Sequence, residues 1–166
     1  MHMMSYDQPG RHSTWEFAQR VAAQGARMLP PHLVTLGLPF YGRHVKTGDW
    51  KSYEDLVQMH APLEPDVDEA GGYYFNGPHL IQRKTRLAIE LGLGGVMIWE
   101  VGQDCRQHAV AHGETTHVVT CPQGERSALL AAIGSELSDG REVGAARALG
   151  TAPVEPGGGS APRDEL

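Results

Sequence analysis

The glycine-rich stretch at residues 91–99 constrains the fold more than any other part of the chain. Gly94 and Gly95 can adopt the tight and left-handed backbone conformations by which a chain leaves a helix and enters a strand. The continuous apolar run at residues 96–98 is typical of a strand in a parallel sheet that is covered on both faces. Trp99 follows at the C-terminal end of this strand, where such sheets carry their sites. Trp99 is therefore either a core residue or part of a site.

Length and composition favour one globular domain with a small or neutral ligand. The chain has 166 residues, of which 40% are hydrophobic, and this is enough for a single core. No apolar run approaches the roughly 18 residues that span a bilayer, and the N-terminus lacks the pattern of a signal peptide, so we expect no membrane partner. A net charge of −6 and scattered Lys and Arg residues argue against a nucleic-acid partner, because phosphate binding needs concentrated positive charge.

The two cysteines leave two interpretations open. Cys105 and Cys121 can close a short loop in an oxidising compartment or stay thiols in the cytosol. Three histidines lie between them, at His108, His112 and His117, so this loop offers enough soft ligands for zinc. The spacing matches none of the usual structural zinc patterns. We therefore favour a solvated loop, with or without a disulfide, and no metal.

The N-terminal part of the chain alternates strand and helix. Residues 3–7 predict a short strand that ends before a Pro-Gly pair. Ser13, with Glu16 three residues later, forms the capping-box signature of a helix that runs to about Met28. Two prolines stop this helix, and an apolar, β-rich run at residues 32–43 predicts the second strand.

The same alternation continues to the C-terminal part. A long loop with one short helix near residues 53–59 follows the second strand. Pro78 suits the first turn of a helix that leads into the glycine-rich stretch. Beyond the cysteine loop, an apolar stripe predicts a last helix at about residues 124–137. From Ser138 onward Gly, Ala and Pro dominate, and this tail is predicted to be disordered.

This order of elements is that of βα units around a parallel sheet, which predicts the α/β class. In such a sheet the C-terminal ends of the strands lie together at one rim. Side chains that are far apart in the sequence should therefore converge there. The expected set is Tyr6, Asp7, Tyr41, Arg43 and Trp99.

The three predicted strands and their ends read Met4-Ser5-Tyr6-Asp7, Leu36-Gly37-Leu38-Pro39-Phe40-Tyr41-Gly42-Arg43 and Gly94-Gly95-Val96-Met97-Ile98-Trp99-Glu100. These segments resemble the sixth, seventh and eighth strands of a glycoside hydrolase family 18 chitinase. Tyr74-Phe75-Asn76-Gly77-Pro78 with Lys84-Thr85, and Gly102-Gln103-Asp104, also fit shorter members of that family. The resemblance implies a partial (β/α)8 TIM barrel over residues 1–137, followed by the tail at residues 138–166.

The resemblance also implies an activity, the hydrolysis of β-1,4 bonds between N-acetylglucosamine units of chitin or chitooligosaccharides. The substrate's own N-acetyl oxygen attacks the anomeric carbon in that family, with one protein carboxylic acid as the proton donor and no cofactor or metal. By this resemblance Tyr6 would donate a hydrogen bond to the N-acetyl group, and Asp7 would bind polar groups nearby. Trp99 would form the apolar floor under the sugar, and Tyr41 and Arg43 would line the groove. Tyr6 could instead be a core tyrosine and Arg43 a surface ion-pair partner.

One departure from the family puts catalysis by this chain in doubt. The family's acid lies in a D-x-x-D-x-D-x-E motif at the end of the fourth strand, and this sequence has no such motif. The nearest imitation, Glu64-Pro65-Asp66-Val67-Asp68-Glu69, follows the seventh strand, and the adjacent Asp68 and Glu69 would face opposite sides of a strand. We therefore interpret this segment as a solvated acidic loop. The alternative to a hydrolase fragment is a non-catalytic remnant that binds chitooligosaccharides.

A barrel of this kind needs roughly 250 residues, and three strands cannot close it. Both sheet edges should then be exposed and the isolated fold marginal, and the remaining N-terminal part of the barrel is a candidate partner. The C-terminal Arg163-Asp164-Glu165-Leu166 resembles the tetrapeptide that retrieves proteins to the endoplasmic reticulum. It suggests a parent protein that is luminal or secreted.

Overall fold

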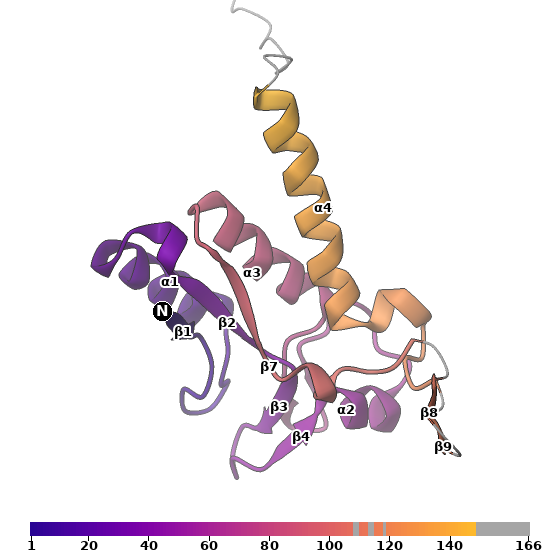
Figure 1. The fold of residues 1–166 in the computed structure, drawn as a ribbon. Helices are drawn as coiled ribbons and strands as arrows, with labels where there is room; N and C mark the ends of the chain where they lie inside the picture. Colours follow the sequence, from indigo (N-terminus) through magenta and orange to yellow (C-terminus); the bar gives the residue numbers. More distant parts are fainter. Residues whose placement is uncertain (108–109, 113–114, 118, 149–166) are drawn as a thin grey trace, which may run out of the picture.

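A three-stranded parallel sheet is the centre of the computed structural model, which describes residues 1–107, 110–112, 115–117 and 119–148 (Figure 1). Its strands lie in the order β1 (His2–Met4), β2 (Thr35–Pro39) and β7 (Gly95–Trp99). Each predicted parallel strand is found, and the α/β class is confirmed. The predicted strand at residues 3–7 is shifted, because pairing with β2 ends at Met4.

Helices cover one face of this sheet. Helix α1 (Trp15–Met28) connects β1 to β2, and helix α3 (Pro78–Glu90) precedes β7; the two helices contact each other and the sheet. The strand register places Leu36 beside Val96 and Leu38 beside Ile98, so these side chains share one face. Leu36 packs there against the helices. The predicted start of α3 at Pro78 is confirmed.

The opposite face of the sheet is open in the described structure. Met4 lies opposite Gly37, which in turn pairs with Met97, so these positions point to this second face. The Met4 side chain is 64% exposed, and β7 is only partly buried along its length. Exposed apolar groups on this face are what we expected of a barrel segment with too few strands to close.

The apolar run at residues 32–43 does not form one strand, contrary to the prediction. It divides into a 3₁₀ turn (Pro31–Leu33), β2 and β3 (Tyr41–His44), and β3 belongs to a second sheet. Phe40 is the point of division: its N–H donates to the Trp99 carbonyl at 2.8 Å, and its side chain is fully buried. The backbone therefore leaves the parallel sheet one residue after Pro39.

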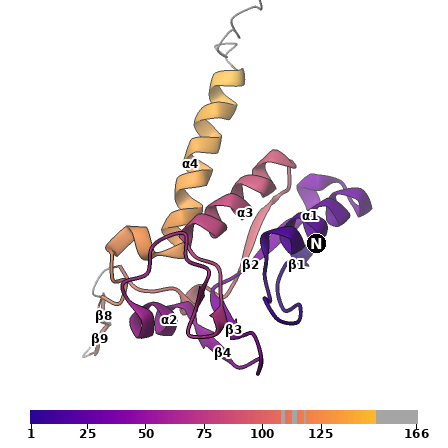
Figure 2. The ribbon, with the colours of Figure 1, turned by 180° about the vertical axis from the view of Figure 1, so that it is seen from behind.

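The second sheet is antiparallel and occupies much of the segment that was predicted to be a loop. Its strand order is β4 (Trp50–Ser52), β3, β6 (Tyr73–Tyr74) and β5 (Glu69–Ala70). The predicted helix near residues 53–59 is confirmed as α2 (Tyr53–His60), whose cap is Ser52. In both views α2 and the β3–β4 hairpin lie together, away from α1 (Figures 1 and 2).

The acidic segment at residues 64–69 is less solvated than predicted. Asp68 is partly buried and accepts a hydrogen bond from the Gly77 N–H at 2.8 Å, and burial raises the pKa of its carboxyl group. Glu69 lies on β5 and pairs with Arg11 at 2.9 Å. The segment ties the start of α3 to β5, so its acids have structural partners.

The cap of α1 also differs from the prediction. Thr14, not Ser13, is the N-cap residue, and its side chain accepts a hydrogen bond from the Phe17 N–H. Ser13 is fully buried and donates its hydroxyl hydrogen to the Ser5 carbonyl at 2.7 Å. Sequence spacing alone could not separate the two neighbouring hydroxyl residues.

A disulfide links Cys105, six residues after β7, to Cys121, eight residues before the last helix. In the chain-entropy view, closing a loop of this size stabilises the fold by about 3 kcal/mol. Both sulfur atoms are used by the bond, which removes the thiolates that a zinc site would need. The loop between them carries β8 (Val110–His112) and β9 (Thr115–His117), and His108 lies outside the described residues.

The last helix begins later and ends later than predicted. A 3₁₀ turn (Gly124–Ser127) precedes α4 (Leu129–Ala148), and the Asp104 carboxylate accepts the Leu129 and Leu130 N–H groups at 3.0 and 2.8 Å. Predicted disorder from Ser138 is wrong up to Ala148, because the segment lacks proline and is rich in helix-forming Ala, Glu and Arg. The predicted tail from residue 149, including the terminal Arg163–Leu166, lies outside the described residues.

Helix α4 packs against α3 at its start and projects beyond the rest of the molecule in both views (Figures 1 and 2). Arg86 on α3 donates two hydrogen bonds to Glu136 on α4, at 2.9 and 2.7 Å. Among the helices that the structure describes, none is long and apolar enough to cross a bilayer.

Candidate functional site

The ends of the parallel strands and the start of the second sheet meet at one place. Trp99 is the last residue of β7 and pairs in register with Pro39 of β2. Because β3 begins only two residues after Pro39, Tyr41 and Arg43 follow directly at the rim. Asp7 lies three residues after β1 ends. The alternation of elements therefore delivers four of the five predicted residues to a shared rim.

Asp7 is the centre of this rim. Its Oδ1 atom accepts a hydrogen bond from the Tyr41 hydroxyl at 2.8 Å and another from Arg43 Nη1 at 2.9 Å. The backbone of Asp7 has a φ of 68°, in the left-handed region that few residues other than Gly, Asn and Asp adopt readily. Such a conformation persists where the surrounding contacts hold it, and here two donors do so.

The Tyr41 hydroxyl is a fixed hydrogen-bond donor to Asp7. Burial, followed by the hydrogen bond to Asp7, raises the pKa of the Tyr41 hydroxyl well above its usual value, so this phenol keeps its proton and acts as a donor. The Arg43–Asp7 pair is about half exposed, and pairs of this kind add little to stability. Its contribution is therefore orientation of the Asp7 carboxylate.

Trp99 completes the site with an apolar surface. It is 55% exposed, and its register position beside Pro39 turns it to the open face of the parallel sheet, together with Met97. It lines a cavity of about 260 Å³ together with Asp7, Tyr41, Arg43, Trp50 and Gln103. Four predicted residues thus share one cavity, and the interpretation of Trp99 as a packed core residue is not supported.

Tyr6 occupies a different place from the other predicted residues. It is only 7% exposed, and its ring packs edge-on against that of Tyr41 at a centroid distance of 6.1 Å. A Cβ atom added at Gly37 would lie 2.9 Å from the Tyr6 ring, so β2 needs glycine at this crossing. Tyr6 is not among the residues that line the cavity, and its ring contacts that of Tyr41, which does line it. Its contact with an N-acetyl group stays a prediction.

Sequence reasoning missed two of the residues that line the cavity, Trp50 and Gln103. Trp50 lies on β4, within the segment that was predicted to be a loop, and nothing in that prediction placed it near Arg43. Gln103 closes the 3₁₀ turn (Val101–Gln103) after β7, and its buried Oε1 atom has no hydrogen-bond partner among the described residues. For Gln103 the available signal was the Gly102-Gln103-Asp104 segment, which resembles shorter members of the chitinase family; the sequence held no comparable signal for Trp50.

A buried polar network holds the loop that carries Asp7. The Lys84 ammonium group donates to the Ser13 carbonyl at 2.8 Å, the Ser13 hydroxyl at 2.7 Å and Asn76 Oδ1 at 2.6 Å. Ser13 in turn donates to the Ser5 carbonyl, and the Ser5 hydroxyl donates to the Gly37 carbonyl at 2.6 Å. Both ends of the loop at residues 5–13 are therefore fastened to β2 and α3.

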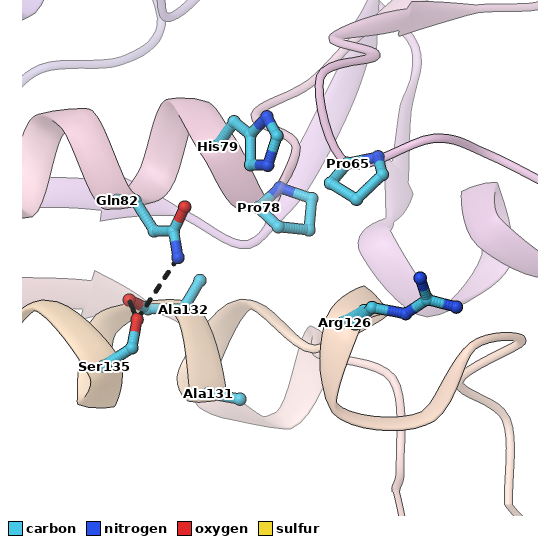
Figure 3. Close-up of a pocket in the computed structure, with 8 residues that line it drawn as sticks. All are labelled: Pro65, Pro78, His79, Gln82, Arg126, Ala131, Ala132 and Ser135. Atoms are coloured by element: carbon cyan, nitrogen blue, oxygen red, sulfur yellow. Dashed lines mark hydrogen bonds between the residues drawn. The ribbon is translucent and has the colours of Figure 1, made fainter.

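A second cavity, of about 270 Å³, lies between the start of α3 and the α4 region (Figure 3). Gln82 crosses it to donate a hydrogen bond to Ser135 Oγ at 3.2 Å. None of the predicted site residues lines it. The cavity at Asp7 is the better candidate because it collects the ends of three strands. The residues in Figure 3 are Pro65, Pro78, His79, Gln82, Arg126, Ala131, Ala132 and Ser135.

Comparison with known proteins gives the fold a context. No family model matches the sequence. Among solved structures, the chain is similar to the GH18 chitinase ChiB from Flavobacterium johnsoniae, with 29% identity and a TM-score of 0.61 over 83% of this chain and 42% of that one. A chitinase from Bacteroides thetaiotaomicron matches 80% of this chain and 41% of its own, with 22% identity and a TM-score of 0.60.

A class V chitinase from Pseudomonas fluorescens gives a further match, with 19% identity and a TM-score of 0.55 over 82% of this chain and 47% of that one. The chain thus spans less than half the length of these chitinases. In structure as well as in its motifs, the chain therefore resembles a part of the catalytic domain of glycoside hydrolase family 18 chitinases.

Proposed function

We propose that this chain supplies part of the sugar-binding cleft of a chitinase-like glycoside hydrolase and binds oligosaccharides of β-1,4-linked N-acetylglucosamine. One observation carries the proposal: the exposed Trp99 ring shares a cavity with Asp7, whose carboxylate is held by Tyr41 and Arg43. The likeness to ChiB, which is a chitinase, supports the sugar class.

The chemistry of the cavity suits a pyranose ring. Such a ring has apolar C–H faces and a polar edge of hydroxyl and acetamide groups, and recognition needs both kinds of surface. Trp99 offers the apolar surface. The Asp7 carboxylate can accept hydrogen bonds from hydroxyl groups, and the Arg43 guanidinium has further N–H groups to donate.

For the whole protein we propose hydrolysis with assistance from the substrate's acetamide. The chain would correspond to the last three strands of a (β/α)8 barrel. The proton donor would come from the family's acidic motif, which lies at the end of the fourth strand of such a barrel. The open edges of β1 and β7 suit pairing with the remaining strands of such a barrel. The second candidate is a non-catalytic sugar-binding protein, which is favoured because this sequence carries the proposed binding residues without the acidic motif.

Replacement of Trp99 by Ala tests the binding proposal. We expect the affinity for chitotetraose to fall about tenfold, because the substitution removes the apolar surface under one sugar ring. Calorimetric titration of both proteins measures this ratio. Trp15→Ala is the matched control, since Trp15 stacks with Arg83 on α3 and does not line the cavity. Equal affinities of the Trp99→Ala variant and the wild type would remove the proposal.

Hydrolysis separates the two candidate functions. The 166-residue chain alone is expected to show no turnover of a chromogenic chitobioside, because loss of general-acid catalysis alone costs about 10²–10⁴ in rate. The decisive assay adds a polypeptide containing the first five βα units of a family 18 barrel. Restored turnover supports the hydrolase, whereas binding without turnover in the mixture supports the non-catalytic alternative. Robust turnover by the chain alone contradicts both.

A further inference from the structure

We propose that a third cavity, between the loop at residues 5–13 and the turn of the β3–β4 hairpin, binds a small oxyanion of the phosphate or carboxylate kind. The loop and the turn lie side by side in both views (Figures 1 and 2). The cavity between them measures about 330 Å³. Asp7 and Arg43 line both this cavity and the one that holds Trp99, so their ion pair lies between the two. The ligand is distinct from the sugar of the proposed function, and its binding does not depend on that function.

A buried histidine without a partner points to a bound group in the third cavity. His12 lines the cavity, and its side chain is fully buried. Neither Nδ1 nor Nε2 of its ring has a hydrogen-bond partner among the described residues. Asp7 Oδ1 lies 3.9 Å from Nδ1, which is too long for a hydrogen bond. An unbonded polar atom in a protein interior costs free energy, so these nitrogens call for a bound water or ligand.

The charges around the third cavity favour an anionic ligand over a cationic one. Apart from its histidines, the lining carries two positive charges, on Arg43 and Lys46, and one negative charge, on Asp7. The Asp7 charge is offset by Arg43, whose Nη1 atom lies 2.9 Å from Asp7 Oδ1. The Lys46 ammonium group forms no ion pair within the described residues. The lining therefore keeps one positive charge without a counter-ion.

Both walls of the third cavity are fixed by their own hydrogen bonds. In the loop, the Gln8 N–H donates to the His12 carbonyl at 3.1 Å, and in the turn the Gly48 N–H donates to the His44 carbonyl at 2.9 Å. Arg43 Nε donates to the Gly48 carbonyl at 3.1 Å. A preformed cavity of this kind can take up a ligand with little reordering of the chain.

Three kinds of donor are available to an oxyanion in the third cavity. Arg43 uses Nε and Nη1 for protein contacts, so within the described structure its Nη2 group is open to a ligand. Lys46 supplies its ammonium hydrogens, and the neutral His12 ring supplies one N–H. Hydrogen bonds from charged donors to an oxyanion are stronger than those between neutral groups. The chain as a whole carries a net charge of −6, so binding must come from these local donors rather than from general attraction.

Titration of the full chain with inorganic phosphate, followed by NMR of the histidine rings, tests the proposal. At pH 6.5 and constant ionic strength, the His12 ring resonances should shift and saturate with a dissociation constant of about 1 mM. The ring of His32, which is exposed and lies outside the cavity, should keep its resonances in place. A parallel titration with acetate shows whether the site also takes a carboxylate. The proposal is overturned if His12 shows no saturable shift with either anion, or if both rings drift alike.

Substitution of the unpaired cation gives a second measurement. Lys46→Ala should weaken the binding of phosphate about fivefold, because it removes the charge without a counter-ion from an exposed position. Lys51→Ala is the matched control, since Lys51 lies on the neighbouring strand β4 and does not line the cavity. It should bind phosphate as the wild type does. Equal affinities of Lys46→Ala and Lys51→Ala would contradict a site built around Lys46.

Discussion

Raising the pH from 7 to 9.5 should stabilise the protein by roughly 2–4 kcal/mol through one buried side chain, Lys84. Lys84 is fully buried, and within the described part of the chain its ammonium group has three acceptors but no carboxylate in direct contact. Burial lowers the pKa of Lys84 to about 7, against the smaller opposing effects of Asp68 and Glu16. Between this value and its unfolded pKa near 10.5, the unfolded state binds more protons, so the free energy of unfolding rises with pH.

Thermal or urea unfolding across this range measures the effect. Lys84→Met removes the titrating group and should flatten the rise, so the difference between variant and wild type grows toward high pH. At high pH the variant should be the less stable protein, because the Ser13 carbonyl and Asn76 Oδ1 lose a donor. Lys46→Met, the same substitution at an exposed position, should keep the full rise. An unchanged rise in Lys84→Met would show that Lys84 does not titrate in this range.

Four tyrosine hydroxyl groups of raised pKa limit the window in which this test is clean. Burial raises the pKa of the Tyr6, Tyr41, Tyr53 and Tyr74 hydroxyls above the usual value of 10. Each of these hydroxyls loses its proton in the unfolded state near pH 10 but keeps it in the folded state. The tyrosines therefore lower the free energy of unfolding only above about pH 10. Below pH 9.5 the Lys84 effect therefore stands apart from theirs.

The parts of this fold that the sequence predicts are those with a local signal. The apolar runs at β2 and β7 and the turn at Gly94 and Gly95 were enough to predict parallel strands. Once parallel strands are assumed, their C-terminal ends must share a rim. The meeting of Asp7, Tyr41 and Arg43 followed from this geometry and from the resemblance to a known family.

The parts that sequence reasoning missed depend on contacts between distant residues. The division at Phe40 requires the Trp99 carbonyl as a partner, and an apolar run of this kind is otherwise indistinguishable from one long strand. Lys84 is bonded to Ser13, which lies 71 residues earlier, so its burial has no local cause. Trp50 faces the site only because of its pairing with Arg43. Each of these is decided by tertiary packing.

Lowering the pH from 6.5 to 4 should reduce the free energy of unfolding by about 3 kcal/mol. The responsible residue is His12, in the loop at residues 5–13 that also carries Asp7. His12 is fully buried, with its ring 5.0 Å from that of Tyr41 and its Nδ1 atom 3.9 Å from Asp7 Oδ1. Burial lowers the pKa of His12 to about 4, helped by Lys84 and Arg43; the Asp7 carboxylate and the Tyr41 backbone oppose this.

The sign of the effect follows from the direction of this shift. With a folded pKa of about 4 and an unfolded pKa near 6.5, the unfolded state binds more protons in the interval, so stability is lost as the pH falls through it. The carboxyl groups of Asp68 and Asp104 have raised pKa values. Their protonation therefore stabilises the folded state as the pH falls toward 4, which opposes the effect of His12. The His12 effect is therefore clearest between pH 6.5 and 5.

His12→Phe separates this effect from general acid unfolding. The variant keeps an aromatic ring against Tyr41 but cannot take up a proton, so its melting temperature should change much less between pH 6.5 and 5. His32→Phe, at an exposed position, should behave as the wild type does. The folded protein keeps His12 uncharged above pH 5, so its affinity for chitooligosaccharides should be the same at pH 6.5 and at pH 5. An equal loss of melting temperature in the wild type and in His12→Phe would show that this histidine does not carry the effect.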